Sequence, residues 1–262
     1  MRHRRRVGFR GQRGRNQLER TDSAESGSGP RHHPTNPGSG HPGADEAAVS
    51  CATRKFCAIV DNSGNAYTWK DGSWLAPQAF GSGTGPSAVA LYASGRVGVS
   101  CPATSACTAV IGTAILDWNG STWSEESLPW TPTLADPSHR ASAVSGNPTA
   151  ISCATSTLCA IVNGSGASYR NGAPTWSPTR TIDPSGMLDS ISCPRVSFCM
   201  AADTDGFIVT WDGATWARPI KVIPAATVHT GIGTSVSCSS ANFCMVMNGD
   251  GDYATFSGTT DG

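Results

Sequence analysis

The phrase Ser-Cys-x5-Cys occurs five times in this chain and limits its possible folds more than any other feature. The first copy reads "VSCATRKFCAIVDNSGNAYTWKDGSW" from residue 49, and later copies begin near residues 99, 151, 191 and 236. All ten cysteines belong to these pairs: Cys51 and Cys57, Cys101 and Cys107, Cys153 and Cys159, Cys193 and Cys199, Cys238 and Cys244. Because the first cysteines lie 40 to 52 residues apart, one structural unit of that length is repeated.

Each copy divides into four short strands. A "VSC" or "ISC" strand precedes an apolar run such as "CAIV", and a third strand usually ends in an aromatic residue. An Asp-Gly or Asn-Gly pair, which accepts the positive φ of a tight hairpin, then leads to a fourth strand. This strand is expected to begin with Trp74, Trp123, Trp176 or Trp216. No segment shows a helical period over three turns, so the repeat predicts an all-β β-propeller of four-stranded antiparallel blades.

The fifth copy is incomplete, because no tryptophan follows "TFSG" before residue 262. We therefore expect five blades, the last without its outer strand. Nothing in residues 1–49 resembles that strand, so the N-terminus is not expected to supply it. Either a five-bladed ring closes imperfectly, or the chain is part of a six- or seven-bladed propeller truncated at its C-terminus. The second interpretation is preferred.

Residues 1–48 differ in composition from the propeller region, residues 49–262. Nine of the nineteen Lys and Arg residues lie in the first 31 positions, among Gly, Pro and Ser and very few apolar residues. Such a segment cannot bury enough surface to fold, so we expect a disordered tail or a misplaced start of translation. The rest of the chain carries a net charge of about −4, which argues against a nucleic-acid partner. No apolar run reaches the roughly 18 residues of a membrane span.

The cysteine pairs have three possible roles. Zinc-binding pairs are usually separated by two to four residues and often joined by histidine. Here the separation is five, and the propeller region contains only His139 and His229, neither near a pair. Redox Cys-x-x-Cys motifs are also absent. Opposed hairpin residues, about 4.5–5.5 Å apart at Cα, suit a disulfide. We expect one disulfide per blade, with a pair of buried free thiols as the alternative. We also expect no metal or cofactor, and secretion or cell-surface display, although no signal peptide is visible.

The "[VI]-S-C" phrase with its second cysteine, glycine turn and Trp-like hairpin resembles repeats of secreted actinobacterial β-propellers, a group often placed with sialidase-like or BNR-type propellers. The resemblance covers residues 49–262 and implies export and a propeller fold, but no activity. The nearest match to a sialidase Asp-box, "TDGFIVTW" at residues 204–211, departs from its residue order. The arginines of the propeller region fall at unrelated blade positions, and "DTDG" and "NGDGD" are interpreted as turns rather than calcium loops.

These features favour a secreted, non-catalytic binding or scaffold module. Its ligand would be an extracellular glycan, cell-wall component or protein, held by the loops between blades, where propellers usually bind. Trp130 lies outside the repeat and is the candidate binding aromatic, whereas the tryptophans in register are expected to pack between blades. We expect a monomer. The alternative is a non-catalytic or degenerate part of a larger secreted, sialidase-like glycoside hydrolase, and whether the chain is an enzyme stays open.

Overall fold

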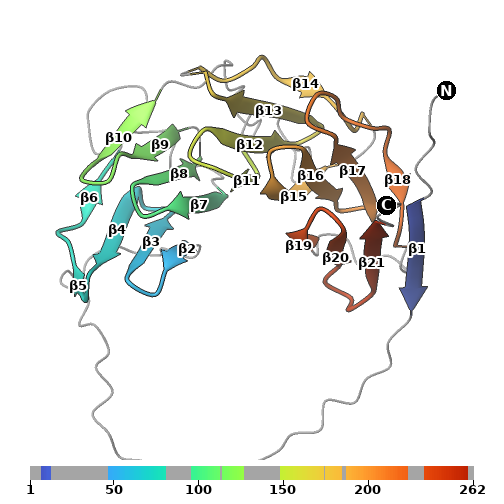
Figure 1. Cartoon of the computed structure of the whole chain (residues 1–262), viewed down its shortest axis with the longest axis horizontal. Coiled ribbons are helices and arrows are strands. Elements are labelled where there is room, and N and C mark those ends of the chain that lie inside the picture. Colours follow the sequence, from blue (N-terminus) through green and yellow to red (C-terminus); the bar gives the residue numbers. More distant parts are fainter. Residues whose placement is uncertain are drawn as a thin grey trace, which may run out of the picture.

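The chain folds into five antiparallel sheets arranged as an arc, each sheet being one blade (Figure 1). The computed structural model describes residues 7–12, 47–80, 96–112, 114–126, 148–173, 175–184, 187–223 and 233–258. All regular secondary structure in these residues is β, and none of them belongs to a helix able to cross a membrane. The predicted all-β propeller architecture is confirmed.

Successive blades use successive parts of the repeat. Blade 1 contains β2 (Ala47–Thr53), β3 (Phe56–Asp61), β4 (Asn65–Lys70), β5 (Ser73–Trp74) and β6 (Gln78–Ala79). Blade 2 contains β7 (Val97–Ala103), β8 (Ala106–Ile111), β9 (Ala114–Trp118) and β10 (Trp123–Glu126). Blade 3 contains β11 (Ala150–Cys153), β12 (Leu158–Asn163), β13 (Gly166–Asn171) and β14 (Arg180–Thr181), and blade 4 contains β15 (Leu188–Arg195), β16 (Phe198–Asp203), β17 (Phe207–Trp211) and β18 (Ile220–Lys221).

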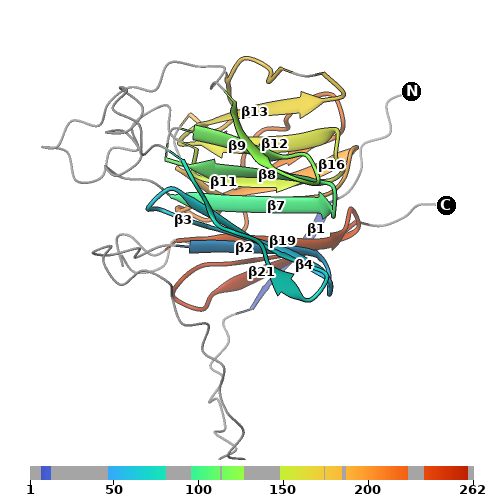
Figure 2. The same cartoon turned by 90° about the vertical axis from the view of Figure 1, so that its left-hand side faces the viewer.

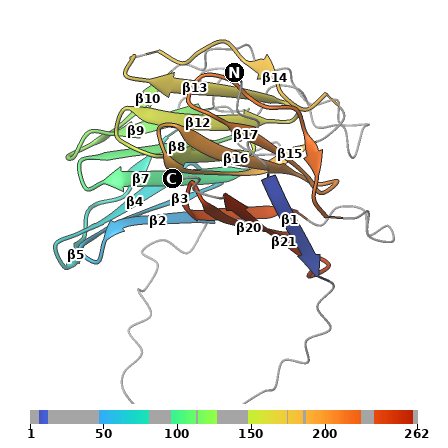
Figure 3. The ribbon, with the colours of Figure 1, turned by 45° about the vertical axis from the view of Figure 1, so that its right-hand side comes forward.

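The fifth blade takes three strands from the end of the chain: β19 (Ser235–Ser240), β20 (Phe243–Met247) and β21 (Tyr253–Gly258). The fourth position, beside β21, is occupied by β1 (Val7–Gln12), which pairs antiparallel with it (Figure 3). The fifth repeat therefore lacks its own outer strand, as predicted, but the expectation that the N-terminus supplies none was wrong. Backbone groups make the pairing, so the edge of β21 does not require a strand that resembles the repeat.

The turns between the third and fourth strands follow the predicted chemistry. In blade 2, the Asn119 side-chain oxygen accepts hydrogen bonds from the Ser121 and Thr122 N–H groups, both at 3.0 Å. The next residue, Gly120, has φ +97°, a conformation that a side chain would strain. In blade 4, the Asp212 side-chain oxygen accepts in the same way from the Ala214 and Thr215 N–H groups, at 2.9 and 2.7 Å. In these two blades the bonds that close the hairpin are local to the turn.

The outer strands are shorter than the sequence suggested. Trp123 begins β10 as expected, but Trp176 precedes β14, and Trp216 makes only an isolated bridge with Trp211. Beyond Trp216, the Ala217 N–H donates to Thr210 O at 2.8 Å, and the pairing with β17 resumes at β18, where Ile220 is opposite Ile208. The outer strand of blade 4 is thus paired in two short stretches rather than along one continuous ladder.

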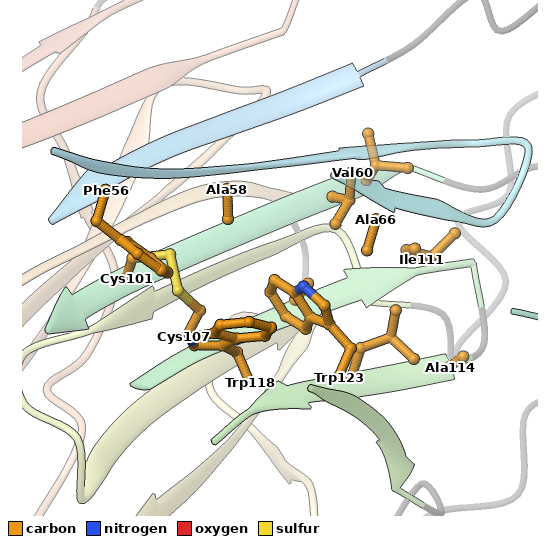
Figure 4. Packing of buried hydrophobic residues seen from close by; sticks show 13 residues of the cluster. Phe56, Ala58, Val60, Ala66, Cys101, Cys107, Ile111, Ala114, Trp118 and Trp123 are labelled. Carbon is orange, nitrogen blue, oxygen red and sulfur yellow. A yellow bond between two sulfur atoms is a disulfide. The ribbon is translucent and has the colours of Figure 1, made fainter. Parts of the chain in front are cut away.

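The core lies between blades. In the contact of blades 1 and 2, Phe56, Ala58 and Val60 on β3 pack against blade 2, including the Cys101–Cys107 disulfide (Figure 4). Trp123 reaches back across this contact, and its Nε1 donates to Thr68 Oγ1 at 3.0 Å. Trp123 also packs on Trp118, with 5.7 Å between ring centroids. The tryptophans in register therefore pack, as the sequence predicted.

The arc does not close into a ring. The inner strands contact one another in series, β2 to β7, β7 to β11, β11 to β15 and β15 to β19. Figure 1 shows the arc open between β2 and β19, and Figure 2 shows the inner strands lying side by side from the edge of the arc. Among the described strands, blade 1 therefore contacts another blade on one side only, and so does blade 5.

Candidate functional site

One face of the arc collects the connections that do not repeat. We define the start face by the first residues of the inner strands, Ala47, Val97, Ala150, Leu188 and Ser235. Because each sheet is antiparallel, the second strand also ends on this face and the fourth strand ends there too. The connections between blades, including residues 81–95, 127–147 and 224–232, therefore leave from and return to the start face.

The five cysteine pairs form five disulfides between the first and second strands of their blades, and no cysteine of the chain is free. Their Cα atoms are 3.9 to 4.1 Å apart, closer than the predicted 4.5–5.5 Å. The N–H of Cys101 points to the preceding blade, so the two cysteines form a non-hydrogen-bonded pair, in which strands approach most closely.

A serine–cysteine hydrogen bond joins each inner strand to the next. Ser50 Oγ accepts from the Cys101 N–H at 3.0 Å, and Ser100 Oγ accepts from the Cys153 N–H at 2.9 Å. Ser152 and Ser192 repeat this bond to the next two blades at 2.9 and 3.0 Å. The serine of one Ser-Cys pair and the cysteine of the next pair thus connect consecutive blades, a role that the sequence did not reveal.

Charged and polar side chains from three blades meet on the start face. Arg96, before β7, forms an ion pair with Asp189 Oδ1 of blade 4. The other oxygen, Asp189 Oδ2, accepts from the Thr234 N–H of blade 5 at 2.8 Å. Gly233 permits this approach, because a Cβ there would lie 2.6 Å from Asp189 Oδ2. Asp189 is buried whereas Arg96 is about half exposed, so a buried carboxylate holds a cationic group that solvent can reach.

Two buried carboxyl groups lie behind this face, between blades 3 and 4. Asp203 closes a turn by accepting from the Asp205 and Phe207 N–H groups at 3.0 and 2.6 Å. Burial, and secondly the neighbouring carboxyl of Asp183, raise the pKa of Asp203 to about 7. The Asp203 carboxyl therefore keeps its proton to a higher pH than an exposed aspartate would.

An ionic network fills the contact between blades 2 and 3. Arg170 binds both oxygens of Asp117 at 2.8 Å, Glu126 Oε2 at 3.0 Å and Thr108 Oγ1 at 3.0 Å. Its guanidinium also lies 5.0 Å from the Trp176 ring centroid. Burial would raise the pKa of Asp117, but hydrogen bonds from Arg170 and Thr108 lower it overall, whereas burial and Asp117 raise the pKa of Glu126. With its donors used by the protein itself, this network stabilises the scaffold.

The sequence contained a signal for this network. Arg170 pairs with Cys159, and the same register position holds an aromatic residue in the other four blades: Trp69, Trp118, Trp211 and Phe256. Aligning the five repeats on the second cysteine shows that arginine replaces the aromatic residue in blade 3. Arg170 belongs to a contact between blades and not to an arginine triad.

The predicted binding residue, Trp130, lies outside the described residues, as do His139 and His229. The "TDGFIVTW" segment forms a turn followed by β17. The "NGDGD" segment is also a turn, in which Asn248 Oδ1 accepts from the Asp250 and Asp252 N–H groups at 3.1 and 2.9 Å. Within the described part of the chain, no group of three His, Cys, Asp or Glu residues is placed to hold a metal ion.

The sequence matches no protein-family model and no curated protein. Its fold is similar to that of YCF48 from Cyanidioschyzon merolae, with a TM-score of 0.51 and 17% identity over 80% of this chain and 68% of that one. It is also similar to virginiamycin B lyase from Staphylococcus aureus, with a TM-score of 0.55 and 9% identity over 80% and 65%. The WD40 propeller of Doa1 gives 0.50 and 12% over 80% and 64%. This chain thus spans about two thirds of each of these propellers, and the likeness concerns the fold alone.

Proposed function

We propose that the chain is a secreted, non-catalytic binding module whose ligand, an extracellular glycan or protein, contacts the start face. The observation that carries the proposal is that the three non-repeating connections, residues 81–95, 127–147 and 224–232, all depart from that face. A repeated scaffold that presents variable segments on one side is the usual arrangement of a propeller that binds through its loops.

The charged cluster on the start face supports this assignment. Arg96 is half exposed and is held by Asp189, so its guanidinium is pre-organised for an acidic or hydroxyl-rich ligand without a large loss of side-chain entropy. Trp130 lies in the second of the three connections and would add an aromatic surface for a sugar ring or an apolar side chain.

Five disulfides support export, because such bonds persist in oxidising compartments and are rare in the cytosol. They also suit a module that must stay folded outside the cell.

The test is binding of the labelled chain to a glycan array and, separately, to a displayed library of random peptides. In whichever screen gives a signal, Trp130→Ala and Arg96→Ala are expected to weaken binding. At least one of the two variants should weaken it tenfold or more. Trp74→Ala is the matched control, since Trp74 is exposed near the turn at Asp71 and Gly72 on the opposite face. Absence of binding to both the glycan array and the peptide library would contradict the proposal. A loss of binding in Trp74→Ala as large as in the start-face variants would contradict the choice of face.

A further inference from the structure

The contact between blades 3 and 4 carries two carboxyl groups where the contact between blades 1 and 2 is apolar. Asp183 in blade 3 is equivalent to Phe80 in blade 1, because the N–H of each donates to the turn between the second and third strands. Across the contact, Asp203 is the fourth residue after the second cysteine, a position that is Ile111 in blade 2. Phe80 packs on the apolar cluster that contains Ile111. We call Asp183 and Asp203 the acid pair.

The acid pair is fully buried, with 0% exposure for both residues. The two carboxyl groups lie within hydrogen-bonding reach of each other, and such a bond requires a proton on one of them because a carboxylate only accepts. Asp203 Oδ1 accepts two turn N–H groups, whereas Asp203 Oδ2 is buried without a hydrogen bond from any described N–H or hydroxyl group.

The charged groups around Asp203 are acidic. Asp183 faces it from blade 3, Asp205 lies in its own turn, and Asp189 lies on β15, the strand that pairs with β16. No ion pair within the described ranges includes Asp203, whereas Arg170 supplies a positive charge to the carboxylates between blades 2 and 3. Within these ranges a proton is therefore what neutralises Asp203.

The acid pair adjoins the backbone bond that joins blades 3 and 4 at the start face. Leu188, opposite Asp203 on β15, donates its N–H to Gly164 O of blade 3 at 2.6 Å. Farther along β15, the Cys193 N–H crosses the same contact to Ser152 Oγ at 2.9 Å. The contact is thus bonded at two places, and the acid pair is beside the first.

Thr234 links the acid pair to the charged cluster on the start face. Its Oγ1 donates to the backbone oxygen of Asp203 at 2.7 Å, and its N–H donates to Asp189 Oδ2 at 2.8 Å. Asp189 in turn pairs with the half-exposed Arg96. A shift of the Asp203 turn would therefore reach the Arg96 guanidinium through two hydrogen bonds and one ion pair.

We propose that the acid pair makes the start-face end of the contact between blades 3 and 4 a pH-sensitive contact. It is closed while Asp203 is protonated and hydrogen-bonded to Asp183. Loss of the proton places two buried negative charges against each other across the contact, so the bond from Leu188 to Gly164 opens more readily.

The proposal adds regulation to the face that the proposed function assigns to binding, and rests on that function only in this respect. Opening at the start of β15 also loosens Asp189, which orients Arg96. The start face is therefore expected to be most ordered when Asp203 is protonated.

The direction of the effect follows from proton linkage. In the closed contact burial, followed by Asp183, raises the pKa of Asp203 to about 7 from 3.8. Opening admits water and returns the pKa towards its ordinary value, so opening releases a proton. The equilibrium should therefore shift towards the open form by up to about tenfold per pH unit between these values, and level off above them.

The experiment is amide hydrogen exchange of the full chain by NMR, expressed as protection factors from about pH 5 to about pH 8. The Leu188 and Thr234 amides should lose protection by about tenfold or more as the pH rises to 7. The Cys193 amide, in the same contact but away from the acid pair, is the internal reference and should stay constant.

Two variants test the assignment to the acid pair. Asp203→Asn cannot ionise, so its Leu188 protection should not vary with pH, and near-ultraviolet circular dichroism checks its fold. Asp183→Asn removes the opposing carboxyl group and should reduce the pH dependence, which keeps the test open if Asp203→Asn does not fold.

Each other outcome would overturn the proposal. A pH-independent Leu188 amide in the wild type would show that no such contact exists, and an equal loss at Cys193 would show that the whole contact opens. A pH dependence that persists in Asp203→Asn and Asp183→Asn would assign the proton elsewhere. A loss at Leu188 without one at Thr234 would separate the contact from the charged cluster. Because exchange needs no ligand, failure here is distinct from absence of binding in the glycan and peptide screens.

Discussion

The contacts between consecutive blades and the two free ends of the arc are built from the same residue positions, yet their surroundings are opposite. Met200 on β16 and Met245 on β20 both follow the second cysteine of their blade. Met200 is fully buried against blade 5, whereas Met245 faces solvent. Ser192 and Ser237 differ in the same way, because Ser192 accepts the Cys238 N–H at 3.0 Å, whereas no described residue of another blade donates to Ser237.

This difference teaches that a blade is not a stable unit by itself. Its second strand is apolar on both sides, and each side is satisfied by a different neighbour. Stability therefore resides in contacts between blades, and substitutions at equivalent positions should have unequal effects at the interior and at the ends.

The largest difference is expected between Met200→Ala and Met245→Ala. Removing the buried Met200 side chain leaves a cavity between blades 4 and 5 and should lower the free energy of unfolding by about 2–5 kcal/mol. The exposed Met245 should change it by no more than about 0.5 kcal/mol. Urea unfolding monitored by tryptophan fluorescence checks both, and equal losses would contradict the difference in burial between Met200 and Met245.

The disulfides offer a second comparison. Replacing Cys153 and Cys159 together by alanine should lower the free energy of unfolding by about 2 kcal/mol from loop closure, and further because both residues are buried. Replacing Cys51 and Cys57 should cost about the loop-closure part alone, since Cys51 is exposed.

Before this test, the intact mass should rise by ten hydrogens on reduction, and an unchanged mass would refute the disulfides.

A smaller effect is expected for the serines. Ser192→Ala removes the acceptor of the Cys238 N–H and should cost about 1 kcal/mol. Ser237→Ala, the matched control at the open end of the arc, should leave the free energy of unfolding unchanged. If the two variants lose equal stability, the serine–cysteine bond does not join the blades.

The last prediction, specific to the contact of blades 3 and 4, concerns the pH dependence of stability. Because the folded-state pKa of Asp203 is raised to about 7 from 3.8, the folded chain binds more protons than the unfolded chain between these values. Stability should therefore fall as pH rises through this window. Asp203→Asn should flatten this slope, because the variant has no carboxyl to titrate at this position. It should still fold, since Asn163 and Asn248 already occupy the same turn position in blades 3 and 5. A wild-type slope that persists in the variant would assign the proton to another group.

The repeat made most of the fold predictable. The alternation of Ser-Cys, apolar run, glycine turn and tryptophan specifies a four-stranded sheet locally, and the cysteine spacing specifies the disulfide. What the sequence did not reveal depends on contacts between distant segments. The pairing of β1 with β21 is made by backbone groups and leaves no side-chain signal. The meeting of Arg96 with Asp189 requires knowing that blades 2 and 4 approach on the start face.

The candidate site was less predictable than the scaffold, for a physical reason. Scaffold residues recur because each blade packs against its neighbours in the same way. Comparing the repeats of one chain with one another therefore identifies them. A ligand is contacted once, so its residues do not recur and only the departures from the repeat point to them. Arg170 is such a departure, and the structure assigns it to packing. Trp130 is another, and its assignment to binding stays a prediction.

The most direct test of the account is amide hydrogen exchange at the first cysteine of each blade, in protein dilute enough to be monomeric. The Cys101, Cys153, Cys193 and Cys238 amides donate to the preceding blade and should exchange slowly, whereas the Cys51 amide, at the free end of the arc, should exchange much faster. A Cys51 amide as protected as the other four in the monomer would contradict an open arc whose blades are stabilised by their neighbours.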